Sequence, residues 1–404
     1  MSLLLILAAA TASAPPPAAA PSQTIVVTGT RLSDSEKALR ECLARHCPPE
    51  EDIRASLAHA ENLFVAGRYR DARDVTKASI GRNNRFRSDY PVAVSDLYRG
   101  NGRIAEHLGE VADFQLSTAL MRGILGNAFG KDDARVLKAD VEVGDMFAKQ
   151  GQFVQARTTY DGAEKRARAA GFASIADIAR VRSAWTYAMD GEIPLARKAL
   201  EKIAAEATPE ARTGRLSALV LLARLDRNEG KTGKASEALF TELRAVRAKR
   251  PILLFSPRLD LPGIVPEGDE AETTADVGWG TPDHRLMAGN AYFEKHWVDV
   301  GFWVTSEGKV TEPEILRGEG TREWTKPLLR SIAGRIYTPS TDPDGAYRIE
   351  RYTLTSRFMD AVSGSHLRAR SPNVRVEFLD LTNDPAPPPS PSPTGGAQAP
   401  SPAR

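Results

Sequence analysis

The residues best suited to chemistry lie near the start of the chain, where Cys42 and Cys47 flank His46 and precede His59. The two thiols could form a disulfide, stay free, or contribute to a metal site. A structural metal site needs about four ligands, and no C-x-x-C pair is present. Positions five apart do not share a helix face, but Pro48–Pro49 should end the helix here. A turn would then bring the sulfurs together, so a disulfide between Cys42 and Cys47 is the favoured interpretation.

No other pattern in the sequence predicts catalysis. The histidines show no H-E-x-x-H motif and no repeated ligand spacing, and there is no G-x-S-x-G nucleophile elbow. Asn228–Thr232 resembles the end of a phosphate-binding loop, but Leu225 stands where the first glycine of that loop would be. We therefore expect a protein that is not an enzyme and that binds neither a cofactor nor a metal.

The composition is that of a globular protein with more than one domain. The chain has 404 residues, of which 42% are hydrophobic and 26% charged. A net charge of +2 provides no long-range field to recruit nucleic acid. Leu3–Ala10 is apolar and precedes the small residues Ala12–Ala14, as in a secretory signal peptide. This run is much shorter than the ~20 residues of a membrane-spanning helix. We expect export to the periplasm and no integral membrane span.

A recurring motif predicts helical hairpins between residues 33 and 250. Each copy begins with Gly. An aromatic or aliphatic residue often stands two positions after this Gly, and Ala stands five positions after it. With a degenerate copy at Gly109–Phe114, the glycines lie 42, 42, 40 and 39 residues apart. Apolar residues precede them at helical spacing, as at Ile53, Leu57 and Ala60. The glycine permits a turn and the alanine a close approach of the second helix. The repeat-turn residues are Gly67, Tyr69, Ala72, Gly151, Phe153, Ala156, Gly191, Ala196, Gly230 and Ala235.

These offsets resemble those of the tetratricopeptide repeat (TPR) family, although the spacing exceeds the family's usual period of about 34 residues. The resemblance covers about half of the chain. It implies a curved solenoid whose concave surface binds a protein or a peptide. An irregular helical bundle without a groove is the alternative.

The sequence period changes in the C-terminal part of the chain. Val298–Thr305 alternates between apolar and polar residues, Ser306–Lys309 reads as a turn, and a second strand follows. An amphipathic helix then ends before Pro339. Tyr347–Phe358 alternates again, and Val374–Leu379 is a candidate last strand. This order predicts a small α+β domain in which one helix crosses a three-stranded sheet.

The same order, together with Glu307–Val310 and Arg335–Pro339, resembles the C-terminal domain of TonB-type energy transducers. The resemblance implies that an extended peptide binds by adding a strand to the sheet edge. Tyr347–Thr355 is the candidate edge; the alternative is that this strand is internal. The chain departs from the family in having helical repeats in place of a spanning anchor and a Pro/Lys-rich spacer. The expected partner-binding residues are Arg348, Glu350, Tyr352 and Leu354.

Near the N-terminus, Gln23–Arg31 ("QTIVVTGTR") is a short β-prone segment. From composition alone it is a strand that docks on the protein's own sheet. It also resembles the TonB box of TonB-dependent outer-membrane receptors, with Gln23 in place of the acidic residue and Gly29 in place of Ala. The resemblance implies pairing with a TonB-like domain of this chain, of a second copy or of a separate transducer. The residues expected to pair are Ile25, Val26, Val27 and Thr28.

The predicted fold is therefore a TPR-like solenoid of helical hairpins followed by a TonB C-terminal-like α+β domain. The predicted function is a periplasmic scaffold or adaptor that binds protein partners through the solenoid and extended peptides through the sheet. Its expected partners are TonB-dependent receptors or another TonB-like domain. The alternative is a membrane-anchored energy transducer. The predicted segments are a signal peptide and linker (1–22), a box-like strand (23–31), helical repeats (33–250), a connector (251–285), the α+β domain (286–381) and a Pro/Ser-rich tail (382–404).

Overall fold

The computed structural model describes residues 31–208, 211–231, 233–245, 250–259, 261, 296–320, 324–360 and 368–382. The box-like residues Ile25, Val26, Val27 and Thr28 lie outside these ranges, as does most of the expected connector. Among the described residues, no helix is both long enough and apolar enough to cross a membrane.

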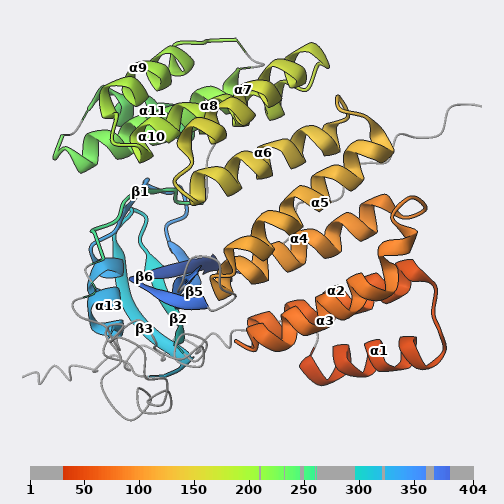
Figure 1. Cartoon of the computed structure of the whole chain (residues 1–404). Helices are drawn as coiled ribbons and strands as arrows, with labels where there is room; N and C mark the ends of the chain where they lie inside the picture. The colour runs from red at the N-terminus through yellow and green to blue at the C-terminus, as the bar shows by residue number, and fades with distance from the viewer. Residues whose placement is uncertain are drawn as a thin grey trace, which may run out of the picture.

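Helical hairpins stack side by side into a curved array that runs from α1 to α11 (Figure 1). This is the TPR-like part of the molecule, and a small sheet domain lies in the opening of its curve. The helices are α1 (Leu32–Ala44), α2 (Pro49–Val65), α3 (Tyr69–Asn83), α4 (Pro91–Leu108), α5 (Val111–Phe129), α6 (Ala134–Lys149), α7 (Phe153–Ala169), α8 (Ala173–Met189), α9 (Ile193–Ala204), α10 (Arg212–Asn228) and α11 (Lys234–Ala245), with a 3-10 turn at Asn84–Phe86 after α3.

A glycine follows the first helix of each hairpin. Gly67 follows α2, Gly151 follows α6 and Gly191 follows α8, with φ of 78°, 77° and 85°. Gly109 and Gly230 occupy the same place after α4 and α10, with φ of 74° and 71°. Side chains disfavour this left-handed conformation, which glycine adopts readily. The glycine period therefore marks the turn inside each hairpin.

The second helix of each hairpin packs through the small residue of the motif. Ala72, Ala156 and Ala196 are fully buried. Ala235 is only half-buried, and the next residue, Ser236, takes the buried position. The last hairpin is thus offset by one residue from the others.

The C-terminal domain contains a four-stranded antiparallel sheet in the order β3-β2-β5-β6. A separate pair joins β1 to β4. One helix, α13, packs on the four-stranded sheet. The elements are β1 (Leu253–Phe255), β2 (Trp297–Val304), β3 (Val310–Glu319), α13 (Thr325–Ala333), β4 (Ile336–Tyr337), β5 (Ala346–Asp360) and β6 (Arg368–Asp380).

Three expectations from the sequence need correction. The sheet was expected to have three strands and has four, because β6 pairs with β5. The segment expected to be a connector begins with β1, which pairs with β4, and Leu253 and Leu259 pack against the core of the sheet domain. The strand expected at the sheet edge, Tyr347–Thr355, is part of β5, which lies between β2 and β6. Alternation of side chains along a strand does not reveal how many neighbours the strand has, because that depends on distant segments.

The core of the sheet domain forms between one face of β2 and α13. Val298, Val300, Phe302 and Val304 are buried in a cluster that includes Trp324, Leu328 and Ile332. The spacing of two along β2 places its four residues on the same face. The alternate residues Trp297 and Asp299 are buried as well, on the opposite face. Both faces of β2 are therefore covered, one by α13 and the other by the helical array.

Candidate protein-interaction surfaces

The residues predicted to bind a peptide at the sheet edge belong instead to the interior of the sheet domain. Leu354 and Tyr352 are part of its buried core. The Glu350 carboxylate accepts hydrogen bonds from Arg335 Nη1, at 2.6 Å, and from the Tyr352 hydroxyl. Arg348 donates to Asp380 at 3.3 Å and to the Pro251 carbonyl at 3.0 Å. These four side chains hold the domain together and are not available to a partner on an open edge.

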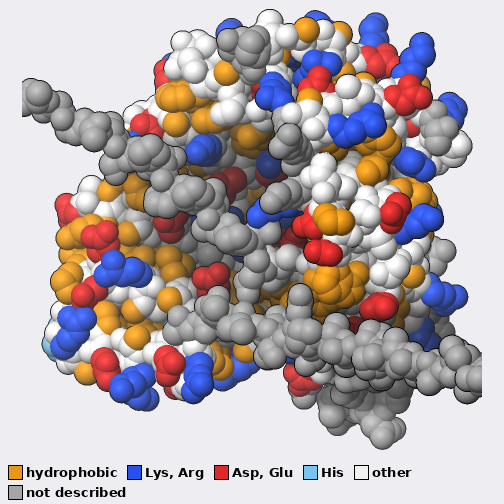
Figure 2. Space-filling view, turned by 180° about the vertical axis from the view of Figure 1, so that it is seen from behind, with side chains coloured by type: hydrophobic (Ala, Val, Ile, Leu, Met, Phe, Trp, Pro, Cys, Tyr) orange, Lys and Arg blue, Asp and Glu red, His pale blue; other side chains and the backbone are white. Residues whose placement is uncertain are grey.

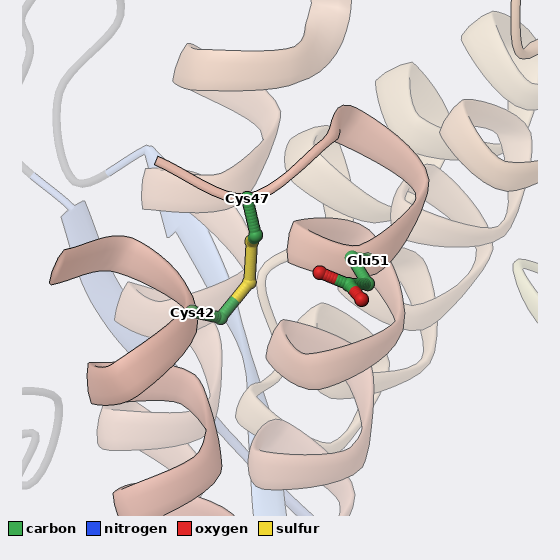
Figure 3. Close-up of side chains that lie close together, drawn as sticks. All are labelled: Cys42, Cys47 and Glu51. Atoms are coloured by element: carbon green, nitrogen blue, oxygen red, sulfur yellow. A yellow bond between two sulfur atoms is a disulfide. The ribbon is translucent and has the colours of Figure 1, made fainter. Parts of the chain in front are cut away.

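Cys42 and Cys47 form a disulfide at the junction of α1 and α2 (Figure 3). Cys42 is buried near the end of α1, and Cys47 lies in the connection before α2. The Pro48–Pro49 pair starts α2 with Pro49 at its first turn. Glu51 is the one further possible metal ligand near the two sulfurs among the described residues, and its carboxylate accepts a 2.7 Å hydrogen bond from Arg45. The arrangement is a covalent tie between two helices.

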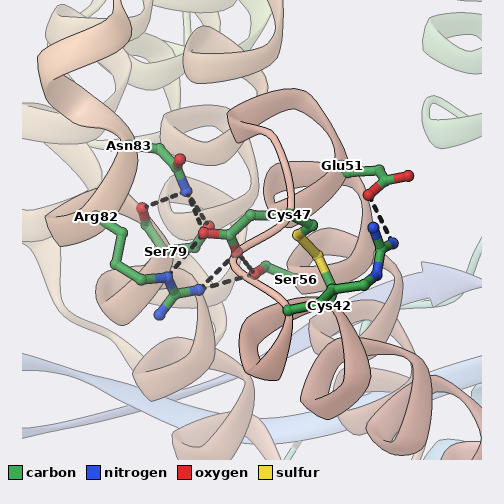
Figure 4. The surroundings of a disulfide bond; sticks show 9 residues. Cys42, Cys47, Glu51, Ser56, Ser79, Arg82 and Asn83 are labelled. Atoms are coloured by element: carbon green, nitrogen blue, oxygen red, sulfur yellow. Dashed lines mark hydrogen bonds and ion pairs between the residues drawn. A yellow bond between two sulfur atoms is a disulfide. The ribbon is translucent and has the colours of Figure 1, made fainter.

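Near the disulfide, Arg82 and Asn83 of α3 point towards α2 (Figure 4), where they bond to the buried Asp52. Arg82 donates two hydrogen bonds to its carboxylate, at 2.7 and 2.8 Å, and Asn83 donates a third at 2.8 Å. Burial alone would raise the pKa of Asp52, but these bonds and one from Ser56 outweigh it and lower the pKa. The ionised Asp52 carboxylate therefore stabilises the packing of α3 against α2 in the first hairpin.

A buried ion pair joins the sheet domain to the first hairpin of the array. Arg351 of β5, with 0% of its side chain exposed, donates two hydrogen bonds to Asp299 of β2, at 2.6 and 2.9 Å. A third bond, of 2.9 Å, goes to the Phe64 carbonyl at the end of α2. Burial opposes the charge of Arg351, but the bonds to Asp299 outweigh this and raise its pKa. The guanidinium also lies 4.1 Å from the ring centre of Trp297.

The turn between α2 and α3 supplies the surface on which the sheet domain rests. The Tyr69 hydroxyl and Thr353 Oγ1 of β5 share a 2.7 Å hydrogen bond. Trp297 covers Gly67 so closely that a methyl group at Gly67 would overlap its indole. Arg375 of β6 donates to the Glu106 carbonyl of α4 at 2.8 Å. The glycine and the aromatic residue of this repeat copy thus serve the domain interface in addition to the hairpin.

His107 lies behind this interface and packs against the rings of Phe64 and Tyr69, which also contact each other. Burial and, to a smaller extent, the nearby positive charges of Lys149, Arg375 and Arg351 together lower its pKa to about 3. Its Nδ1 has no hydrogen-bond partner among the described residues. His107 is therefore a neutral packing residue at neutral pH.

The far end of the array touches the sheet domain too. Arg224 of α10 donates to the Leu253 carbonyl of β1 at 2.9 Å. The Thr338 amide, next to β4, donates to the Ile252 carbonyl at 2.8 Å. Because α2 to α4 hold one side of the domain and α10 the other, the sheet domain bridges the two ends of the curved array (Figure 1).

Between these contacts the array leaves a cavity of about 620 Å³, here called the helical groove. Its lining comes from the first helices α4, α6 and α8, with three residues of α5. Glu142 accepts from Arg99 at 3.0 Å, Glu106 pairs with Lys149 at 2.6 Å, and Asp145 pairs with Arg182. Seen from behind, the molecule shows charged side chains of both signs around its central recess (Figure 2).

A second cavity, of about 470 Å³, lies between α2, α4 and the end of β6 and is here called the interdomain cavity. Leu57, Phe64 and Ile104 line its array side, and Leu379 and Leu381 line its sheet side. It shares Arg99 and Arg103 with the helical groove. The two cavities are therefore neighbours along α4.

Reasoning from the sequence predicted a concave binding surface but missed the ion pair and the residues that line the groove, although each leaves a signal. Asp299 is a single carboxylate within the apolar strand Trp297–Val304, and such a buried charge requires a partner. The groove residues of α6 are Lys138, Val141, Glu142, Asp145 and Lys149. Steps of three and four place such residues on one face of a helix, so this face could have been traced once a curved array was assumed.

No family model matches this sequence, and no curated protein matches it either. Solved structures of helical-repeat proteins are similar in part. BtubC (BKLC) from P. vanneervenii is 14% identical with a TM-score of 0.42, covering 59% of this chain and 98% of that one. A Podosopora anserina putative kinesin light chain with nearly identical TPR-like repeats is 18% identical with a TM-score of 0.39, covering 50% and 96%. Rap protein complexed with competence and sporulation factor is 12% identical with a TM-score of 0.38, covering 52% and 58%.

Proposed function

We propose that this chain is a non-enzymatic scaffold that binds a protein partner in the helical groove. The observation that supports this most strongly is the cavity of about 620 Å³ that α4, α5, α6 and α8 line together. Specific recognition by a solenoid uses the surface that successive repeats build jointly, because no single hairpin is large enough. Half-exposed Ile178 gives the groove an apolar contact beside its charged side chains.

Site-specific photo-crosslinking tests this proposal. A photoreactive side chain at Ser174, which lines the groove, should give one discrete adduct with a partner in cell-envelope extract. The matched control is the same side chain at Lys165, an exposed residue of α7 that lies outside both cavities. Adducts of the same kind from both positions, or none from Ser174, would contradict binding in the groove.

A second proposed activity is strand addition at β3. Among the described residues β3 pairs only with β2, whereas the inner strand β5 is occupied on both sides. Leu32, the first residue of α1, packs against the same core cluster as Phe64, and Arg317 of β3 donates to the carbonyl of the next residue, Val65, at 3.5 Å. The segment 23–31 therefore joins the described chain near β3. We propose that this TonB-box-like segment pairs with the β3 edge of its own chain.

Hydrogen exchange measures this pairing directly. The amides of residues 24–28 should exchange slowly in the full chain and quickly after Ile25→Pro, which removes a ladder donor. Ile25→Val keeps the donor and should leave the protection unchanged. Fast exchange of these amides in the unaltered protein would exclude the pairing.

The proposed compartment is the periplasm, with a link to TonB-dependent transport. The signal-peptide-like N-terminus and the Cys42–Cys47 disulfide support it, because disulfides persist in oxidising compartments. N-terminal sequencing of the protein from fractionated cells should find a chain cleaved near Ala14 in the periplasmic fraction. An uncleaved, membrane-bound chain would instead favour the alternative of an anchored energy transducer.

A further inference from the structure

The helical groove and the interdomain cavity adjoin along α4 and together make a composite surface with two different halves. Arg99 and Arg103 line both cavities, so α4 is their common wall. In the groove half, five cations face three carboxylates, an excess of two positive charges. The cations are Arg99, Arg103, Lys138, Lys149 and Arg182, and the carboxylates are Glu106, Glu142 and Asp145.

The excess positive charge resides on two identifiable side chains. Arg99, Lys149 and Arg182 are each engaged by a carboxylate of the groove. Within the described parts of the chain, Arg103 and Lys138 have no salt-bridge partner, and both are exposed. They stand on α4 and α6, two of the helices that line the groove. Two such cations favour carboxylates of a bound partner, with charge-assisted hydrogen bonds as the source of affinity.

The interdomain half differs in character. Leu57, Phe64, Ile104, Leu379 and Leu381 give it an apolar lining. Its remaining charged neighbours are acidic: Glu61, Asp96 and Asp380, of which Asp96 pairs with Arg99 and Asp380 with Arg348. An apolar side chain would gain from burial here, whereas an acidic one would be repelled.

We infer that this composite surface binds an extended peptide segment of another protein that carries acidic residues next to an apolar anchor. The acidic residues lie over Arg103 and Lys138, and the anchor enters the interdomain cavity between α4 and the end of β6. The inference rests on the proposed function, because it specifies the partner of the same groove. Leu379 and Leu381 belong to the sheet domain, so the partner contacts both domains at once.

A display selection of random peptides against the full chain tests the inference. Enriched peptides should combine Asp or Glu with a nearby Leu, Ile, Phe or Met. In fluorescence anisotropy with single enriched peptides, Arg103→Ala/Lys138→Ala should weaken binding by about tenfold or more. Added salt should weaken binding to the unaltered protein more than to this variant. Leu381→Asp should weaken it similarly, by placing a charge in the apolar half.

Matched controls use exposed positions outside both cavities. Lys165→Ala on α7 and Leu195→Asp on α9, where Leu195 is 49% exposed, should leave affinity unchanged. If no peptide is enriched at all, the proposed function of the groove fails with the inference. If peptides bind without acidic residues, or bind the Arg103/Lys138 variant equally well, the inference alone is overturned.

One alternative occupant lies within the chain, at the acidic run Glu267–Glu272. The carboxylates of this run can be changed to amides. If peptide selection succeeds only after that change, the run itself occupies the groove, and the inference of an external partner is overturned. Selection that gives the same peptides with and without these changes supports the external partner.

Discussion

Two turns of the helical array have the same local design and different surroundings. Gly67 and Gly151 each end the first helix of a hairpin, with φ of 78° and 77°. No described atom lies within 4 Å of the point where a side chain of Gly151 would begin, whereas Trp297 of the sheet domain covers Gly67. The same motif can thus form the turn of a hairpin alone, or form that turn and also contact a second domain.

The ion pairs near these two turns also differ, in how deeply their side chains are buried. In the middle of the array, the buried Asp140 of α6 pairs with Arg122 of α5 and Arg166 of α7, whose side chains are 36% and 27% exposed. At the docked end of the array, where α2 to α4 contact the sheet domain, Arg351 and Asp299 are almost completely buried. A buried pair costs much more than an exposed one when a single partner is removed, because the remaining charge has lost its solvent. The docked end should therefore be the more sensitive region.

The largest effect is expected from Arg351→Met, which removes the charge that joins the domains. Among the described residues, Asp299 then keeps the half-exposed Arg317 as its salt-bridge partner, and the Phe64 carbonyl loses a donor. We expect about 4 kcal/mol of lost stability in urea unfolding. The double variant Arg351→Met/Asp299→Leu should recover much of the loss, since both charges are gone. A single-variant loss no larger than that of Arg122→Met on α5 would contradict the comparison.

Acid should destabilise the docked end through His107. Its pKa is about 3 in the folded protein and near 6.5 when unfolded, so the unfolded chain takes up the proton first as pH falls. The stability contribution is complete above pH 6.5 and is lost as pH falls towards 3. The loss should be on the order of 3 kcal/mol. His107→Phe should flatten the pH dependence in this window; the same slope in both proteins would rule the assignment out.

Gly67→Ala and Gly151→Ala compare the two turns directly. Both place a side chain at positive φ, which costs about 1 kcal/mol. Gly67→Ala also forces Trp297 away, so we expect a total of about 3 kcal/mol there. Thermal or urea unfolding of the two variants gives the difference. Equal losses would mean that the sheet domain does not rest on the α2–α3 turn in solution.

The smallest effect is expected at the disulfide, which adds a covalent tie to the docked end. Replacing Cys42 and Cys47 by Ser should lower the free energy of unfolding by about 2 kcal/mol, because only a short loop is released in the unfolded state. Reductant should shift the unaltered protein by the same amount and leave the variant unchanged. A reductant effect on the variant would point to another cause.

Much of the secondary structure could be predicted locally. Gly at positive φ, Ala at the close approach and apolar steps of three and four along Ile53–Ala60 are properties of neighbouring residues. The alternation along Val298–Val304 likewise shows which residues face α13. The partner-binding assignment of Glu350, Tyr352 and Leu354 was wrong because the neighbour that covers β5 on its second side, β6, is set by tertiary pairing.

The sequence by itself determined the hairpins, their period and the order of strands and helix in the C-terminal domain, since each depends on contacts a few residues apart. Only the tertiary structure decided that β5 is internal, that Arg351 meets Asp299 and Phe64, and that α4 separates a charged groove from an apolar cavity. These features join residues that lie from tens to hundreds of positions apart, as Arg351 does with Asp299 and with Phe64. Their free energy comes from burial and charge pairing between segments that are distant in the chain. The sequence of one such segment does not show which other segment it will contact.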